Sequence, residues 1–94
     1  METIIFKRNK LSLSWDSYSN GNKSLELLDK NFEPYMVAST SLNDVVLKDN
    51  EILIKNYSEN EGILECLVAN NIVKPTGKFV ESGYVTIQIC EIIK

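Results

Sequence analysis

The stretch that most constrains the fold lies near the C-terminus, between residues 74 and 90. Within it, Val85, Ile87 and Ile89 alternate with Thr86 and Gln88, which is the period of a β-strand. We expect this strand to lie inside a sheet, with its three aliphatic side chains in the core. The rest of the chain is expected to pack around it.

Two short segments before this strand predict changes of chain direction. Pro75-Thr76-Gly77 predicts a tight turn, because proline fixes φ and glycine permits a positive φ. Ser82-Gly83 predicts a bulge, at which an otherwise extended chain bends.

Earlier segments add more strands. Leu11, Leu13 and Trp15 alternate with polar residues, so all three are expected on the buried face of one strand. Asn20-Gly21 follows and predicts a hairpin turn, because both residues tolerate positive φ. The other predicted strands are Thr3–Lys7, Ser24–Leu28, Tyr35–Thr40 and Ile52–Ile54, and the three-residue run Val45–Leu47 favours a loop.

One helix is predicted from about Glu59 to Asn70. Ser58 and Glu61 have the spacing of a capping box, in which each side chain accepts from the backbone amide of the other residue. Asn70-Asn71 predicts a left-handed stop. The side chains expected to face the core are Ile63, Leu64, Leu67 and Val68.

Together these segments predict an α+β fold in a single domain spanning residues 1–94. Its core is a twisted antiparallel sheet of about five or six strands with one helix packed on a face. One short helix cannot cover both faces of such a sheet. The other face is therefore expected to be polar or to form an interface, and a homodimer is compatible with that pattern.

Composition excludes several kinds of site. The formal net charge is −3, which argues against direct, generic binding to a nucleic-acid backbone. The chain has no histidine, so the most common general base and metal ligand are missing. We expect no catalytic residues, no metal and no cofactor, and therefore no enzyme.

Cys66 and Cys90 are not spaced as a metal-binding or redox pair, and no secretory signal is recognised. We expect both thiols to be free and reduced, and both cysteines to serve as small buried or half-buried apolar residues. We also expect the protein to be cytoplasmic. No apolar run approaches the roughly 18 residues needed to span a membrane. No partner in a membrane is expected.

The candidate binding residues gather around the predicted turn. Lys74, Thr76, Gly77 and Lys78 could capture a phosphate or an acidic surface with backbone amides and ammonium groups, and Arg8 and Lys10 could join them. The alternative interpretation is a structural turn flanked by solvated lysines. Ser82, Gly83 and Tyr84 could present an aromatic side chain to a partner, or form only the bulge.

Several short elements occur together in one order along the chain. They are Glu33-Pro34-Tyr35, then Asn56, Asn60 and Gly62, then Leu67, Asn70 and Asn71, then Pro75-Thr76-Gly77, and finally Ser82-Gly83-Tyr84. Over roughly residues 33–92, this order resembles a family of small uncharacterised proteins carried by conjugative elements and phages of Firmicutes and Bacteroidetes. The resemblance implies an accessory gene of mobile DNA. It carries no known activity.

That setting leads to two functional hypotheses. The first is a non-enzymatic interaction protein that inhibits a bacterial defence system, of the anti-CRISPR or anti-restriction type, by binding a protein effector. An acidic face would dock on the basic nucleic-acid channel of that effector. The alternative is a nucleotide-binding sponge that uses the segment from Lys74 to Tyr84, or an uncharacterised accessory domain.

Overall fold

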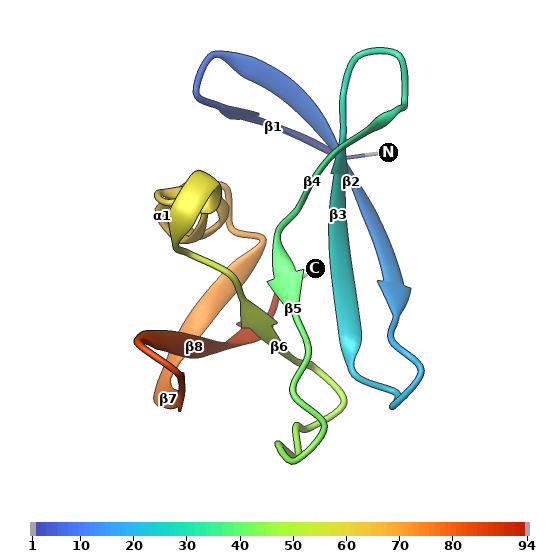
Figure 1. Ribbon diagram of the computed structural model, residues 1–94. Helices are drawn as coiled ribbons and strands as arrows, with labels where there is room; N and C mark the ends of the chain where they lie inside the picture. The colour runs from blue at the N-terminus through green and yellow to red at the C-terminus, as the bar shows by residue number, and fades with distance from the viewer. Residues whose placement is uncertain (1, 94) are drawn as a thin grey trace.

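The computed structural model describes residues 2–93, which form antiparallel strands and one short α-helix (Figure 1). The predicted α+β class is confirmed, but the strands form two four-stranded sheets, in the orders β1-β2-β3-β4 and β5-β6-β8-β7. The elements are β1 Thr3–Phe6, β2 Asn9–Ser17, β3 Lys23–Leu28, β4 Pro34–Val37, β5 Ser39–Thr40, β6 Glu51–Ile54, the 3-10 turn η1 Ser58–Asn60, α1 Ile63–Ala69, β7 Val73–Ser82 and β8 Val85–Ile92.

The first sheet follows the predicted alternation. Asn20-Gly21 forms the turn between β2 and β3, where the Tyr18 amide donates to the Asn22 carbonyl at 2.7 Å. Leu11 and Leu13 are buried as expected. The expectation for Trp15 was wrong, because this side chain remains 38% exposed near the end of β2.

The chain changes sheets at Ala38, which splits the predicted strand Tyr35–Thr40 into β4 and β5. The amide of Ala38 donates to the Leu25 carbonyl in the first sheet, while its carbonyl accepts from the Lys55 amide beside the second sheet. Ala38 is fully buried at this crossing. The backbone of Ala38 is therefore hydrogen-bonded on both sides of the crossing.

The predicted capping box does not form. The Ser58 carbonyl, not its hydroxyl, accepts from the Glu61 amide, and Gly62 has a φ of 96° directly before α1. The Asn56 carboxamide oxygen instead accepts from the amides of Gly62 and Leu64, both at 3.0 Å. The helix therefore begins later than predicted and contains only seven residues.

The end of the helix is as predicted, since Asn71 adopts a φ of 58° and the Ile72 amide donates to the Leu67 carbonyl. Ile63 and Leu67 are fully buried and Leu64 is partly buried against the core. The expectation that Val68 faces the core was wrong, because this side chain is exposed.

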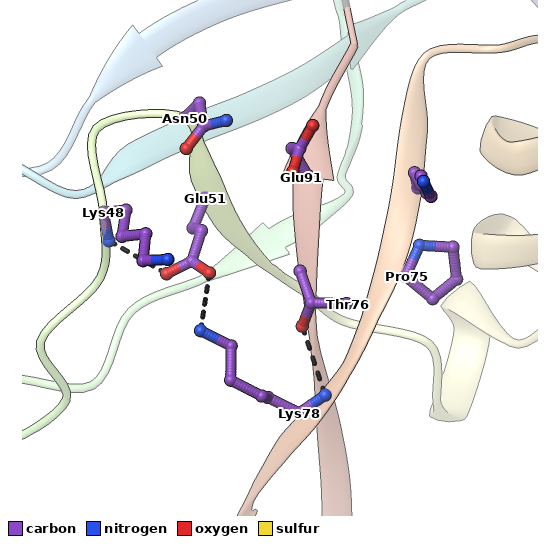
Figure 2. A pocket seen from close by; sticks show the side chains of 8 residues that line it. Lys48, Asn50, Glu51, Pro75, Thr76, Lys78 and Glu91 are labelled. Carbon is purple, nitrogen blue, oxygen red and sulfur yellow. Dashed lines mark hydrogen bonds and ion pairs between the residues drawn. The ribbon is translucent and has the colours of Figure 1, made fainter.

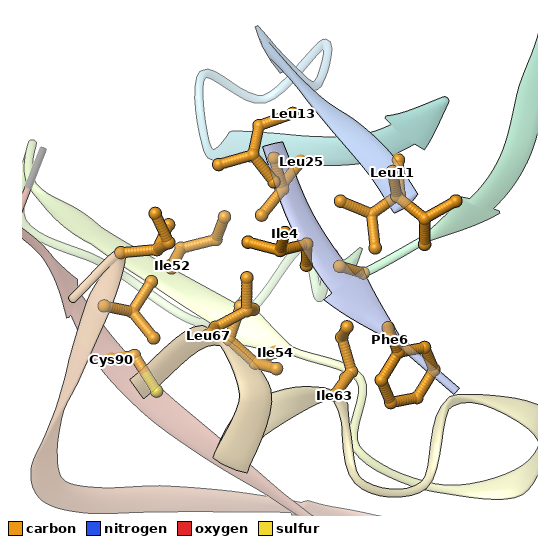
Figure 3. Packing of buried hydrophobic residues seen from close by; sticks show 14 residues of the cluster. Ile4, Phe6, Leu11, Leu13, Leu25, Ile52, Ile54, Ile63, Leu67 and Cys90 are labelled. Atoms are coloured by element: carbon orange, nitrogen blue, oxygen red, sulfur yellow. The ribbon is translucent and has the colours of Figure 1, made fainter. Parts of the chain in front are cut away.

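β8 lies inside the second sheet, paired with β6 on one side and β7 on the other, which confirms its predicted place. Its two faces contact different apolar clusters. Cys90 faces the main core, where side chains from the first sheet meet those of β6 and α1 (Figure 3). Ile87 and Ile89 pack on the opposite face against Leu53.

The expectation that the aliphatic face of β8 points into the main core is therefore corrected. That face is covered by Leu42 and Leu47 from the loop between β5 and β6, together with Tyr57. The loop between β5 and β6 therefore packs on this face of the second sheet, on which the helix had been expected to be insufficient. Within residues 2–93, no helix is long and apolar enough to cross a membrane.

Near the C-terminus, the bulge and the turn lie at the opposite segments from those predicted. Pro75-Thr76-Gly77 is not a reversing turn, because β7 continues through it and pairs with β8 at Pro75↔Cys90 and again at Phe79↔Gln88. Three residues of β7 thus face the single residue Ile89, which makes a bulge. The reversal comes later, where Ser82 pairs with Val85 across Gly83-Tyr84.

Candidate functional site

The bulge of β7 forms one wall of an open cleft of about 400 Å³ on the second sheet (Figure 2). The opposite wall comes from the loop before β6 and from the start of that strand. The lining residues are Lys48, Asn50, Glu51, Lys74, Pro75, Thr76, Lys78 and Glu91. We call this hollow the bulge cleft.

Thr76 fixes the shape of the bulge. Its hydroxyl donates to the Ile89 carbonyl at 2.8 Å and accepts from the Lys78 amide at 3.1 Å. Gly77 occupies the crest with a φ of 86°, and a Cβ at that position would meet no other atom within 4 Å. Glycine is needed here for its backbone conformation and not for space.

Glu51 is the electrostatic centre of the cleft. Although only 5% exposed, its carboxylate accepts from the Lys48 amide at 2.9 Å and from the Lys78 ammonium group at 2.8 Å. The backbone hydrogen bond from Lys48 lowers the pKa of Glu51, and the hydrogen bond from Lys78 lowers it further. Glu51 is therefore held ionised, and each of its two carboxylate oxygens accepts a hydrogen bond.

This arrangement limits the chemistry of the bulge cleft. Lys78 already neutralises Glu51, and Lys74 lies opposite Glu91 in the β7–β8 register. The lysines and carboxylates that line the cleft therefore largely balance. The cleft can hold a polar or weakly anionic group.

The structure separates the predicted binding residues into two groups. Lys74, Thr76 and Lys78 line the bulge cleft, with Gly77 at the crest beside them. Ser82, Gly83 and Tyr84 form the distant hairpin turn. Arg8 and Lys10 line a different hollow on the first sheet and do not join the lysines of β7.

Sequence reasoning missed the residues that complete the bulge cleft. Lys48 and Glu51 lie more than 20 residues before the bulge, and the hydrogen bond from Lys78 to Glu51 spans 27 positions. The charges of Lys48 and Glu51 are visible in the sequence. Their place in the cleft depends on the pairing of β6 with β8, which no local pattern specifies.

Beyond the bulge, β7 and β8 form a hairpin, residues 79–88, that we call the arm. β7 is the edge strand of its sheet, so the outer side of the arm has no neighbouring strand among the described residues. Tyr84 at the tip is fully exposed, and Phe79 at the base is 55% exposed. The arm therefore presents two aromatic side chains to solvent.

Neither cysteine is prepared for nucleophilic chemistry. Burial raises the pKa of Cys90 to about 11, and burial also raises the pKa of Cys66. The Cys66 thiol donates to the Ile5 carbonyl at 3.2 Å, which ties α1 to β1. Both thiols are free.

Among residues 2–93, no three cysteine, aspartate or glutamate side chains gather closely enough to hold a metal ion. Comparison of the chain with family models, curated proteins and solved structures gives no significant match to any of them.

Proposed function

We propose that this chain is a non-enzymatic interaction protein from mobile DNA that inhibits a bacterial defence effector by binding it in the cytoplasm. The observation that carries the proposal is the exposed aromatic pair Phe79 and Tyr84 on the arm. The resemblance to small proteins of conjugative elements and phages supplies the biological setting.

An arm of this kind suits contact with a protein. Tyrosine is among the residues that contribute most at protein interfaces, because it buries a large ring and still offers a hydroxyl. Tyr84 is presented at a two-residue turn, where its side chain is fully exposed. The hairpin is held in place by the bulge and by the pairing of β7 with β8.

Charge near the arm supports a basic partner. Glu61 and Glu65 are exposed at the start of α1, and α1 packs against β7. Figure 1 shows the helix and the arm on the same side of the molecule. Glu81 is exposed on the arm itself. Exposed carboxylates on the same side of the molecule as the arm favour a partner with a basic nucleic-acid channel.

The chemistry of the described side chains supports binding over catalysis. Glu51 is ionised and occupied, and the pKa of each cysteine is raised. The chain also has no histidine. The alternative, a nucleotide-binding protein built on Lys74 to Tyr84, would need an aromatic wall beside the lysines, and Phe79 and Tyr84 lie outside the bulge cleft.

The test compares the wild type with a double variant, Phe79→Ala with Tyr84→Ala. Both proteins are used to capture effectors from a host lysate, and the dissociation constant for each purified candidate is then measured. We expect a complex of defined stoichiometry with a nucleic-acid-handling effector. The double variant should weaken it about thirtyfold or more, an effect of about 2 kcal/mol that is typical of interface aromatics.

The matched control is Val46→Ala, which removes an almost fully exposed apolar side chain from the loop between β5 and β6. This change should leave the affinity unaltered. Equal affinities for the wild type and the double variant would contradict the role of the arm. The absence of a stable complex with any nuclease or nucleotide-signalling effector would contradict the proposal itself.

A further inference from the structure

A second hollow, of about 440 Å³, is lined by residues of the β1–β2 turn and the β3–β4 loop. Figure 1 shows this turn and this loop at the same end of the first sheet. Its lining residues are Arg8, Asn9, Lys10, Leu11, Asp29, Lys30, Asn31 and Tyr35. We call it the turn cleft. A neighbouring hollow of about 270 Å³ shares Lys10 and Lys30 with it and adds Phe32.

The turn cleft is lined by three cationic side chains. Among the described residues, Arg8, Lys10 and Lys30 form no ion pair. The β2–β3 pairing ends at Ser12↔Leu28, and the chain then carries Lys10 and Lys30 into the same two hollows. Like charges that face each other repel, so a bound anion would stabilise this arrangement.

Asp29 is the one acidic residue in the lining of the turn cleft, and its carboxylate is already engaged. One oxygen accepts from the amides of Asn31 at 2.8 Å and Glu33 at 3.0 Å, which closes the β3–β4 loop. The cleft therefore keeps a positive excess in a chain whose formal net charge is −3.

Aromatic rings lie next to these cations. Tyr35 is 49% exposed in the turn cleft, and its hydroxyl accepts from the Asn9 side chain at 3.1 Å, which fixes the ring across the gap between the two turns. Phe32 is 65% exposed in the adjoining hollow. The two lysines thus line both hollows, one of which also contains Tyr35 and the other Phe32.

Backbone conformation is consistent with a use for these side chains. Lys7 and Arg8 have φ values of 48° and 70°, and Phe32 has a φ of 60°. Glycine or asparagine would occupy such positions at lower cost. The exposed side chains of Arg8 and Phe32 gain nothing from burial in the core, so their presence at strained positions favours a role in binding.

We propose that the turn cleft binds a nucleoside phosphate. The phosphate lies among Arg8, Lys10 and Lys30, and the base stacks on Tyr35 or Phe32. Cations can bind the phosphate of such a ligand and exposed rings can stack on its base, whereas a simple anion would use only the cations. The ligand could be a free nucleotide or the end of a single strand, since the two share this chemistry.

The experiment is calorimetric titration of the full chain with four probes at one salt concentration. The probes are tripolyphosphate, AMP, the dinucleotide pApA and a deoxythymidine decamer. We expect saturable binding of at least one nucleotide probe, more tightly than tripolyphosphate. The double variant Lys10→Ala with Lys30→Ala should weaken that binding about tenfold or more, because charge-assisted hydrogen bonds are lost.

Further variants separate the contribution of the cations, which bind phosphate, from that of the rings, which stack on the base. Lys23→Ala with Lys55→Ala removes the same number of positive charges at positions that line neither cleft and should leave the affinity unchanged. Phe32→Asn removes a ring while suiting the left-handed backbone, and Tyr35→Ala removes the other ring. At least one of these two changes should weaken nucleotide binding without weakening tripolyphosphate binding.

Each outcome decides the proposal. Tight binding of AMP or pApA identifies a free nucleotide as the source, and preference for the decamer identifies a single strand. Unchanged affinity in the Lys10 and Lys30 double variant would overturn the proposed place of the site. Equal affinity for tripolyphosphate and every nucleotide, or no binding of any probe at millimolar concentration, would overturn the ligand class. None of these results depends on the arm.

Discussion

At the scale of single residues, the bulge cleft depends on how one buried carboxylate is satisfied. Glu51 receives a backbone amide and an ammonium group, and both interactions favour its ionised form. The stabilisation from Lys78 is reduced by solvent, because that side chain is about half exposed. The backbone amide of Lys48 is therefore expected to contribute a large share.

The first prediction concerns Glu51→Gln. We expect a loss of about 1 kcal/mol of unfolding free energy at pH 7, because the charged acceptor is removed. The pKa of Glu51 is lower in the folded protein than its ordinary value of 4.5, so its stabilisation is present above that value. As the pH falls through the folded-state pKa, the stabilisation is lost.

Urea unfolding at pH 7 and at successively lower pH values checks this prediction. The difference between the wild type and Glu51→Gln should shrink as the carboxylate of the wild type becomes protonated. The exposed Glu81→Gln serves as a control and should change little at either end. A difference for Glu51→Gln that stays constant with pH would contradict the account.

At the scale of elements, the sequence predicted the strands better than the connections. Strict alternation in Leu11–Leu13 and Val85–Ile89 identified strands, because burial of one face imposes a period of two. Pro75-Thr76-Gly77 requires positive φ whether it reverses the chain or bulges within it. Only the renewed pairing of β7 with β8 at Phe79↔Gln88 decides between the two, and that contact is not local.

The second prediction concerns the bulge. Thr76→Val should destabilise the fold by about 1–2 kcal/mol, because the Ile89 carbonyl and the Lys78 amide both lose a partner. Thermal unfolding of this variant is compared with that of Thr86→Val, an exposed position on the same hairpin. Equal effects of the two substitutions would show that the Thr76 hydroxyl does not hold the bulge.

The third prediction concerns the start of α1. Asn56→Ala should cost about 1–2 kcal/mol of unfolding free energy, since its side chain caps two backbone amides. Ser58→Ala should change stability by less than about 0.5 kcal/mol, because its hydroxyl caps nothing. Chemical denaturation measures both variants. The reverse order of effects would restore the capping box that the sequence suggested.

At the scale of the whole molecule, the two sheets are joined where the chain crosses between them. Ser39 directly follows Ala38, and its hydroxyl oxygen accepts from the Leu25 amide at 2.9 Å. This side chain takes the place of the backbone carbonyl that a neighbouring strand would offer. Asn60 does the same for the Val37 carbonyl, to which it donates at 2.7 Å. Ser39 and Asn60 are buried, so these bonds are shielded from water.

Neither the crossing between the sheets nor the full lining of the bulge cleft could be predicted from the sequence, because both depend on contacts between distant segments. Neither Ala38 nor Ser39 interrupts the extended pattern from Tyr35 to Thr40, so a single strand was the natural prediction. Lys74, Thr76 and Lys78 were identified because they surround a glycine. Glu51 was not identified, because only the completed second sheet places it there.

The fourth prediction follows from this crossing. Ser39→Ala should lower the unfolding free energy by about 1–3 kcal/mol, because the buried Leu25 amide loses its acceptor and Tyr18 loses its hydroxyl partner. Ser14→Ala, at a half-buried position on β2, is the control. Hydrogen exchange at the Leu25 amide should accelerate only in Ser39→Ala. Protection unchanged from the wild type would contradict the proposed link between the sheets.

The proposed inhibition of a defence effector is tested most directly by nucleic-acid cleavage with the effector recovered in the binding experiment. Cleavage is measured while this protein is added in known ratio to the effector. The account predicts that inhibition saturates at a fixed stoichiometry and that Phe79→Ala with Tyr84→Ala largely removes it. Unimpaired cleavage at saturating protein, or inhibition that needs only a small catalytic amount, would contradict a binding inhibitor.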